Sequence, residues 1–258
     1  MPETTPFRTA WITGGSTGIG RALVLELVRR GAHVAVSGRT VESLQSLEDA
    51  AKDLPGKVIS LPLDVADRAA TLRAGEDAVR LLGGLDLMVA CAGTHVPMKA
   101  DNFSSSPFRK LLETNVMGTV HALEAVIPRF VAQRRGHVVV VSSVAGYRGL
   151  PTASAYGASK AALINMSEAL HIELKRHGVT LQLVNPGFVR TPLTGKNTFP
   201  MPFLMPVEKA GRQFYEGLLT KRFEITFPKR FTWIMKLMRL LPYALYLPIT
   251  ERITRGQR

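Results

Sequence analysis

Residues 10–23, AWITGGSTGIGRAL, decide the fold: an apolar run ends in a cluster of glycines, and apolar residues then return at helical spacing. This pattern fits two kinds of site. Residues 14–18, GGSTG, match the G-x-S-x-G turn that presents a nucleophilic serine between a strand and a helix. The same glycines also match a turn at which the first N–H groups of a helix bind a phosphate.

The order of the chain favours the phosphate hypothesis. A nucleophilic serine of the hydrolase kind follows several strands and an oxyanion-forming loop, whereas Ser16 follows the first predicted strand. In a phosphate-binding turn, Gly14 permits the tight turn and Gly18 lets a pyrophosphate approach the backbone. Gly20 lets the helix approach the sheet, and Thr17 can add a hydroxyl donor beside that of Ser16.

Short β-rich runs alternate with longer amphipathic segments along the chain. Strands are predicted at 9–13, 33–37, 57–61, 85–90, 137–142 and 180–185. Helices are predicted near 18–30, 41–53, 67–82, 107–132 and 154–177. The alternation predicts an α/β fold, a Rossmann-type doubly wound parallel sheet in three α/β/α layers, and the length suits one domain over 1–258.

Two C-terminal regions depart from this alternation. Four prolines within residues 192–206 argue against a long helix, so 188–220 is predicted to be a substrate flap or lid. Its apolar side chains are expected to cover a pocket or pack on a neighbour, and they include Phe199, Met201, Phe203, Leu204 and Met205. Residues 221–258 form a basic and apolar extension.

Two residues four apart, Tyr156 and Lys160, lie in a predicted helix and therefore share one helical face. Thirteen residues before Tyr156, Ser143 follows a predicted strand, at the sheet edge where ligands bind in this fold class. Its neighbour Ser142 is the other candidate at this strand end.

With the T-G-x-x-x-G-x-G spacing over 13–20, these residues resemble the classical short-chain dehydrogenases and reductases. The resemblance covers about residues 8–192. It implies that Asn115, in LETNVMG, joins the catalytic group and supports a water-linked proton path to the lysine. One departure is the fourth strand's end, which reads Ala-Cys-Ala-Gly over 90–93 where the family has Asn-Asn-Ala-Gly.

The residue types fit carbonyl–alcohol chemistry. A carbonyl that accepts a hydride develops alkoxide character, so it needs a proton donor and a hydrogen bond that fixes its oxygen. We expect Tyr156 to be the general acid and Ser143 the orienting donor. A free phenol has a pKa near 10, and we expect Lys160 to lower it. The resemblance also implies that this lysine holds the nicotinamide ribose.

The second predicted strand ends without the acidic residue that commonly binds the ribose 2′-hydroxyl of NAD. Arg39 and Ser37 could instead bind a 2′-phosphate, so we predict NADP(H) over NAD(H). The predicted cofactor-binding residues are Gly14, Ser16, Thr17, Gly18, Ile19, Gly20, Ser37, Arg39, Asp64, Val65, Ala92, Gly93, Asn115, Tyr156, Lys160, Pro186, Gly187, Val189 and Thr191.

These inferences predict an NADP(H)-dependent oxidoreductase that reduces a carbonyl, or oxidises the corresponding alcohol, of a lipophilic small molecule. Two alternatives stay open: a non-catalytic NADP(H)-binding sensor or scaffold, and a serine hydrolase that uses Ser16. The six histidines lack metal-ligand spacing, so no metal is expected. By family analogy, the helices near 107–132 and 154–177 could pair between the subunits of a dimer or tetramer.

The extension suggests further partners. The formal net charge is +13, and residues 221–258 carry nine basic and two acidic side chains. Trp233, Tyr243 and Tyr246 among leucines and cations suit a membrane interface or a groove on a partner. A tail packed over its own pocket, or a subunit contact, fits equally. Nucleic acid is not an expected partner, because the zinc-finger and RNA-binding motifs are missing from the sequence.

Location is predicted from what the sequence lacks. The N-terminal residues lack the basic and apolar pattern of a secretion signal. No uninterrupted apolar run is as long as the about 18 residues that a membrane-spanning helix needs. The single cysteine, Cys91, excludes an internal disulfide and is expected to be a small apolar group. We therefore expect a cytoplasmic protein, at the inner face of a membrane if the extension binds lipid.

Overall fold

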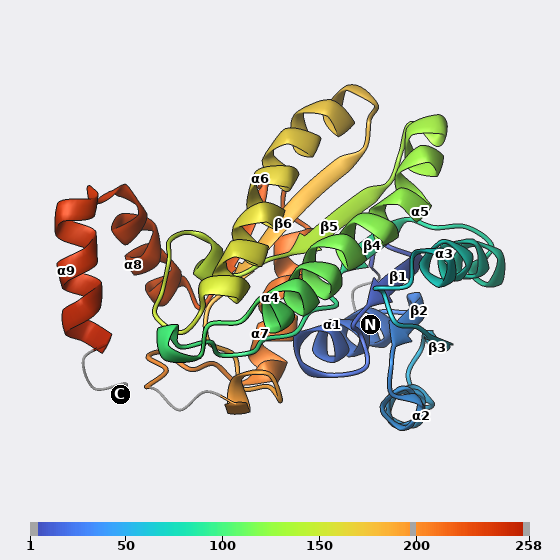
Figure 1. The fold of residues 1–258 in the computed structure, drawn as a ribbon. Helices are drawn as coiled ribbons and strands as arrows, with labels where there is room; N and C mark the ends of the chain where they lie inside the picture. The colour runs from blue at the N-terminus through green and yellow to red at the C-terminus, as the bar shows by residue number, and fades with distance from the viewer. Residues whose placement is uncertain (1–4, 197–199, 255–258) are drawn as a thin grey trace.

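A computed structural model describes residues 5–196 and 200–254 (Figure 1). Within them, seven parallel strands form a sheet in the order β3-β2-β1-β4-β5-β6-β7. The strands are β1 (Thr9–Thr13), β2 (His33–Gly38), β3 (Lys57–Pro62), β4 (Leu87–Ala90), β5 (His137–Val141), β6 (Thr180–Pro186) and β7 (Glu224–Phe227). The predicted doubly wound sheet is confirmed, and β7 is a strand that sequence analysis missed.

Helices cover both faces of the sheet (Figure 1). One apolar core lies between the sheet and α1 (Gly18–Arg29), α2 (Val41–Ala51) and α7 (Val207–Leu218). The other lies between the sheet and α3 (Arg68–Leu82), α5 (Gly118–Gln133) and α6 (Ser154–Arg176). The alternation of β1 shows why both cores form: Ala10 and Ile12 point into the first and Trp11 into the second.

The predicted site residues follow the carboxyl ends of the strands, and β1 and β4 are neighbours in the middle of the sheet. From β1 the chain continues to β2 and β3 on one side, and from β4 it continues to β5, β6 and β7 on the other. Thr13, the last residue of β1, pairs with Ala90, the last residue of β4. The loops that follow these strands therefore begin side by side, at the switch point where ligands bind in doubly wound sheets.

The helix predicted near 107–132 is present and runs without a break over 105–133. It consists of α4 (Ser105–Leu111), a π-helical turn at Leu112–Met117 and α5. Sequence periodicity does not reveal the turn, because its six residues are too few to show a change of period. The turn contains Asn115, whose side chain is fully buried.

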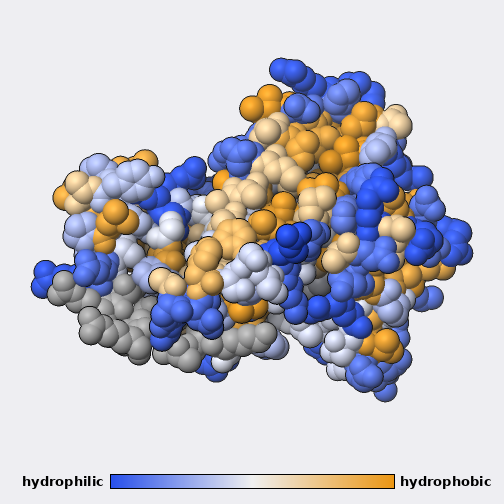
Figure 2. Space-filling model, viewed as in Figure 1, coloured by the Kyte–Doolittle hydropathy of each residue, from blue (hydrophilic) through white to orange (hydrophobic). Residues whose placement is uncertain are grey.

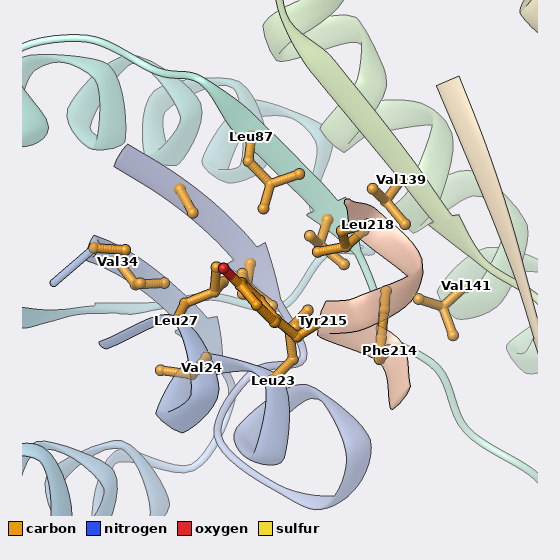
Figure 3. Packing of buried hydrophobic residues seen from close by; sticks show 14 of the residues in the cluster. Leu23, Val24, Leu27, Val34, Leu87, Val139, Val141, Phe214, Tyr215 and Leu218 are labelled. Atoms are coloured by element: carbon orange, nitrogen blue, oxygen red, sulfur yellow. The ribbon is translucent and has the colours of Figure 1, made fainter. Parts of the chain in front are cut away.

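The region expected to be a flap, 188–220, contains α7, which belongs to the core. Phe214 and Leu218 of α7 pack among Leu23 of α1 and Val139 of β5 (Figure 3). Its apolar residues recur at helical spacing after the last of the prolines, which is the signal that was missed. Before α7, Met205 is buried and bridges to Val189, whereas Phe199 falls outside the described residues.

The C-terminal extension contains β7 and two further helices, α8 (Lys229–Leu240) and α9 (Tyr243–Thr254). These two helices lie next to each other at the end of the molecule away from β3 (Figure 1). Pro242 separates them. Among the described residues, none of the helices is long and apolar enough to span a bilayer.

A first prediction concerns the core role of α7. Phe214 is fully buried, and its ring centroid lies 6.1 Å from that of Phe227 in β7. Replacing Phe214 with alanine leaves a cavity, so we expect the free energy of unfolding to fall by about 3–5 kcal/mol. Urea denaturation followed by circular dichroism measures it. Glu216→Ala, at an exposed position of the same helix, is the control, and equal stabilities of the two variants would contradict the core assignment.

Candidate active site

Two loops touch at the ends of β1 and β4, and glycine is required for their contact. Gly14 has a φ of 67°, and a Cβ there would lie 2.7 Å from the backbone nitrogen of Ala92. A Cβ at Gly20 would lie 2.3 Å from the carbonyl oxygen of Gly14. The Gly14 N–H donates to the carbonyl of Ser37 at 2.7 Å. The first turn of α1 is thus held tightly against the end of β1.

A cavity of about 370 Å³ opens at this point. Apart from Asn115, every residue predicted to bind the cofactor lines it. The cavity wall also includes Cys91, Thr94, Thr114 and Thr194, which sequence analysis did not name for this role. Thr94 directly follows the Ala92-Gly93 pair, so its position beside a recognised motif is the signal that was available.

The start of α1 is open toward an anion. Its N-cap residue, Thr17, makes no side-chain capping hydrogen bond, and the first turn carries no acidic residue. Free N–H groups at a helix start favour phosphate. Among the described residues, Arg39 is the cation in the cavity wall on the β2 side. Ser37 lies two residues before it, and its hydroxyl accepts a hydrogen bond from the Trp11 indole at 3.0 Å. These residues fit a dinucleotide.

Lys160 is buried at the end of the cavity. Its Nζ donates to the carbonyl of Val141, the last residue of β5, at 2.9 Å. The same Nζ lies 5.8 Å from the ring centroid of Tyr156, one turn earlier on α6. Burial lowers the pKa of Lys160 to about 8. At neutral pH this side chain is therefore still mostly an ammonium ion.

Burial also has the largest effect on the pKa of the Tyr156 phenol. It raises the pKa of Tyr156, and the hydrogen bond with the Ser143 side chain only opposes this. The expected lowering by Lys160 is wrong for the protein alone, because its ammonium group is directed to the Val141 carbonyl. Burial also raises the pKa of Cys91 to about 11, so its thiol is neutral near pH 7, as expected of a small apolar group.

The two neighbouring serines have different surroundings. Ser142 is buried, and its hydroxyl donates to the carbonyl of Lys160 at 2.7 Å. Ser143 begins the short 3₁₀ turn Val144–Gly146 and accepts from the Ala145 N–H at 3.1 Å. Its Oγ lies 3.5 Å from the carbonyl oxygen of Pro186. Ser143 is thus available to a ligand, whereas Ser142 joins α6 to the end of β5.

Asn115 lies behind the cavity wall. Its Oδ1 accepts from the Thr94 N–H at 2.8 Å, and its Nδ2 donates to the Thr94 carbonyl and the Ser159 hydroxyl, both at 3.0 Å. A Cβ added to Gly93 would lie 3.4 Å from Asn115 Oδ1 and 3.5 Å from Lys160 Nζ. The asparagine side chain therefore holds the loop after β4 against α6 next to the lysine.

A second cavity, of about 420 Å³, meets the first. Ser143, Tyr156 and Gly187 line both. The lining of the second cavity is mostly apolar and comes from the 143–156 and 187–203 segments and from α8 and α9. Sequence analysis missed His95, which lines this cavity and packs edge-on against Tyr156 with ring centroids 4.7 Å apart.

A metal cluster is not part of this arrangement: the described residues contain no group of three or more histidine, cysteine or acidic side chains placed to hold an ion. The reactive groups brought together are a phenol, a hydroxyl and an ammonium ion. Such a set transfers protons and orients an oxygen.

Comparison with known proteins supports this chemistry. The family model of short chain dehydrogenases matches residues 8–200. An uncharacterized oxidoreductase of Myxococcus xanthus is 39% identical over 96% of this chain and 98% of its own length. A 3-oxoacyl-(acyl-carrier-protein) reductase of Thermotoga maritima is 35% identical over 72% of this chain and 75% of its own.

Solved structures agree with the fold. A short-chain dehydrogenase from Streptomyces avermitilis superposes with a TM-score of 0.82 at 25% identity, over 97% of this chain and 99% of that one. The family model covers most of the chain. The matched residues include the glycine turn, strands β1 to β6 and the Tyr156–Lys160 pair. The chain belongs to the short-chain dehydrogenase/reductase family and is an NAD(P)-dependent oxidoreductase.

Proposed function

We propose that the protein transfers a hydride between NADP(H) and the carbonyl or alcohol carbon of a lipophilic small molecule. One observation carries the proposal. Ser143 and Tyr156 line both the cavity that contains the glycine turn and the apolar cavity. A cofactor in the first and a substrate in the second would come together at these two hydroxyl groups.

The protein's own residues supply the proton and the orientation. Tyr156 gives its proton to the carbonyl oxygen during reduction and takes it back during oxidation, and Ser143 donates a hydrogen bond to the same oxygen. The nicotinamide, when bound, supplies or accepts the hydride. Apolar walls on the substrate side exclude water, which strengthens both hydrogen bonds.

Lys160 and Asn115 support this pair. The Lys160 ammonium lies 5.8 Å from the Tyr156 ring centroid and lines the first cavity, where we propose that it holds the ribose of the cofactor. Asn115 is a positioning residue, because its side chain is occupied by Thr94 and Ser159. We expect the water-linked proton path to pass the lysine rather than the asparagine amide.

NADP(H) is the proposed cofactor because of the charge beside β2. Arg39 lines the cavity directly after this strand, and Ser37 lies two residues before it. A guanidinium group can pair with a 2′-phosphate through two parallel hydrogen bonds.

A lipophilic substrate is proposed because of the composition of the second cavity. Phe188, Phe231 and Met235 contribute to its wall, and the rings of Phe188 and Phe231 are stacked with centroids 5.1 Å apart. Burying methylene groups there is favourable by about 0.8 kcal/mol each. We propose that the irregular segment before α7, within 188–220, and the extension 221–258 together form the cover of this cavity.

A homo-oligomer is a further proposal. The helices near 107–132 and 154–177 keep exposed apolar side chains, among them Leu112, Met117 and Ile172. Pairing across these helices would cover them.

Our second prediction tests the role of Tyr156. Tyr156→Phe keeps the ring but removes the proton donor, so ketone turnover should fall by about 10²- to 10⁴-fold. Binding of NADPH, measured by fluorescence titration, should stay within about twofold of the wild type, because the variant keeps the cavity shape. Tyr215→Phe, at a buried position of α7 in the core, is the control. Unchanged turnover in Tyr156→Phe would favour the sensor hypothesis.

A third prediction concerns cofactor choice. Arg39→Ala removes a charge-assisted pair worth about 1.5–3 kcal/mol, so kcat/KM for NADPH should fall by about 10- to 150-fold. The value for NADH should hardly change. Arg73→Ala removes the same charge from an exposed position on α3 and serves as the control. Equal kcat/KM for both cofactors in the wild-type protein would refute the NADP(H) preference.

The fourth prediction concerns the substrate. In a series of 2-ketones, each added methylene should raise kcat/KM by about fourfold until the cavity is filled. Ile234→Glu, which places a charge at the cavity wall, should lower kcat/KM for long ketones only. Trp233→Glu changes an adjacent, exposed residue outside the cavity wall and is the control. A preference for small charged ketones would contradict the proposal.

A further inference from the structure

The helices α8 and α9 carry most of the exposed large apolar side chains of the described residues. Each helix has 12 residues. Of seventeen such side chains, nine lie on these two helices: Trp233, Ile234, Leu237, Leu240, Tyr243, Leu245, Leu247, Ile249 and Ile253. Single exposed apolar residues are ordinary, but a cluster of this size marks an interaction surface. We call these nine side chains the α8–α9 surface.

α9 contacts the rest of the protein along one narrow stripe. Tyr246 and Thr250 are its buried residues, and the Tyr246 hydroxyl donates to the Gly149 carbonyl at 2.7 Å. Ile253 continues this stripe at helical spacing and lines the second cavity. Away from this stripe, Leu245 and Leu247 are more than half exposed.

Basic side chains accompany the apolar ones. The two helices carry Lys229, Arg230, Lys236, Arg239 and Arg252 against one acidic residue, Glu251. Apolar and hydrophilic side chains lie beside each other at this end of the molecule (Figure 2). Lys236 Nζ lies 5.6 Å from the centroid of the Trp233 ring. Aromatic, leucine and basic residues in this combination suit the boundary between lipid headgroups and acyl chains.

Charge separates the two candidate occupants. Lys236 pairs with Glu224, and an Arg239 guanidinium nitrogen lies 3.9 Å from a Glu168 carboxylate oxygen, but the two helices keep an excess of basic residues. A second copy of the chain, paired face to face through this surface, would therefore bring like charges together. An anionic bilayer instead attracts each cation, by about 1 kcal/mol for a Lys or Arg near the surface. Charge complementarity therefore favours the bilayer.

The mouth of the second cavity lies at the same surface. Ile234, Ile253 and Phe203 line this cavity and yet are between 47% and 72% exposed. We propose that the α8–α9 surface docks on an anionic lipid bilayer, with the mouth of the apolar cavity facing the acyl chains. The substrate would then enter from the membrane, and this second part rests on the proposed function.

Vesicle binding tests the docking without substrate or cofactor. The chain has two tryptophans, and Trp11 is fully buried, so a change in tryptophan fluorescence on adding vesicles reports Trp233. We expect a blue shift with vesicles of phosphatidylcholine and phosphatidylglycerol, and a much weaker one with phosphatidylcholine alone. Trp233→Phe should abolish the shift but not the co-sedimentation of the protein with the mixed vesicles.

A charge-matched pair of variants tests the position of the surface. Leu237 and Leu240 are 62% and 80% exposed and lie outside the cavity wall, so replacing them should not disturb the fold. Leu237→Glu combined with Leu240→Glu should bind the mixed vesicles at least about tenfold more weakly. Leu81→Glu with Leu219→Glu makes the same charge change at exposed apolar positions elsewhere and should bind like the wild type.

Three results would overturn the docking proposal: absence of vesicle binding, equal loss in both pairs of variants, or a concentration-dependent dimer that Leu237→Glu with Leu240→Glu dissociates. The last result would assign the surface to a second copy. Delivery from lipid is tested separately. For a long ketone dissolved in vesicles, this variant should raise KM, whereas for the same ketone in solution its kcat and KM should match the wild type. A protein that binds vesicles but reduces no ketone would refute the proposed function and leave the docking intact.

Discussion

Lys160 is bound to the carboxyl edge of β5 through both its side chain and its backbone carbonyl, and the geometry of the candidate site depends on these two hydrogen bonds. Its Nζ donates to the Val141 carbonyl, and its own carbonyl accepts from the Ser142 hydroxyl. An ammonium ion without partners would be costly inside a protein, so the bond to Val141 is what makes burial tolerable. Because Ser143 follows directly, the clamp that holds α6 also sets Ser143 opposite Tyr156.

The sequence predicted the parts of this arrangement that follow from local rules. Glycines at 14, 18 and 20 predict a turn with close backbone contacts. In the structure, a Cβ on Gly14 or Gly20 would collide with neighbouring backbone atoms. The pair Tyr156 and Lys160 is a consequence of helical periodicity. Strand order then brings the separate motifs to one sheet edge, which is why the predicted site residues surround a single cavity.

What the sequence did not show depends on contacts between distant segments. The Asn115 amide, in the π turn, donates hydrogen bonds to Thr94 and Ser159, neither of which is near it in sequence. The pKa of Tyr156 follows from the depth of the site, which no local pattern gives. β7 has four residues, too few for a periodic signal, and it is recognisable through its pairing with β6.

The wall of the apolar cavity and the loop of Ser143 have a common support, the carboxylate of Glu224 at the start of β7. It accepts from the Tyr147 hydroxyl, just beyond the 3₁₀ turn after Ser143, and from the Asn185 amide, and it pairs with Lys236 of α8. Partial burial alone would raise the pKa of Glu224, but these hydrogen bonds outweigh it and hold the pKa below the ordinary value.

The ionised form of Glu224 is therefore the one that joins α8 to Tyr147, beyond the turn after Ser143, at neutral pH. Protonation in acid would weaken the bond to Lys236 first, because that bond depends most on charge. One carboxylate thus connects α8, which lines the apolar cavity, with Tyr147 beyond the 3₁₀ turn that follows Ser143.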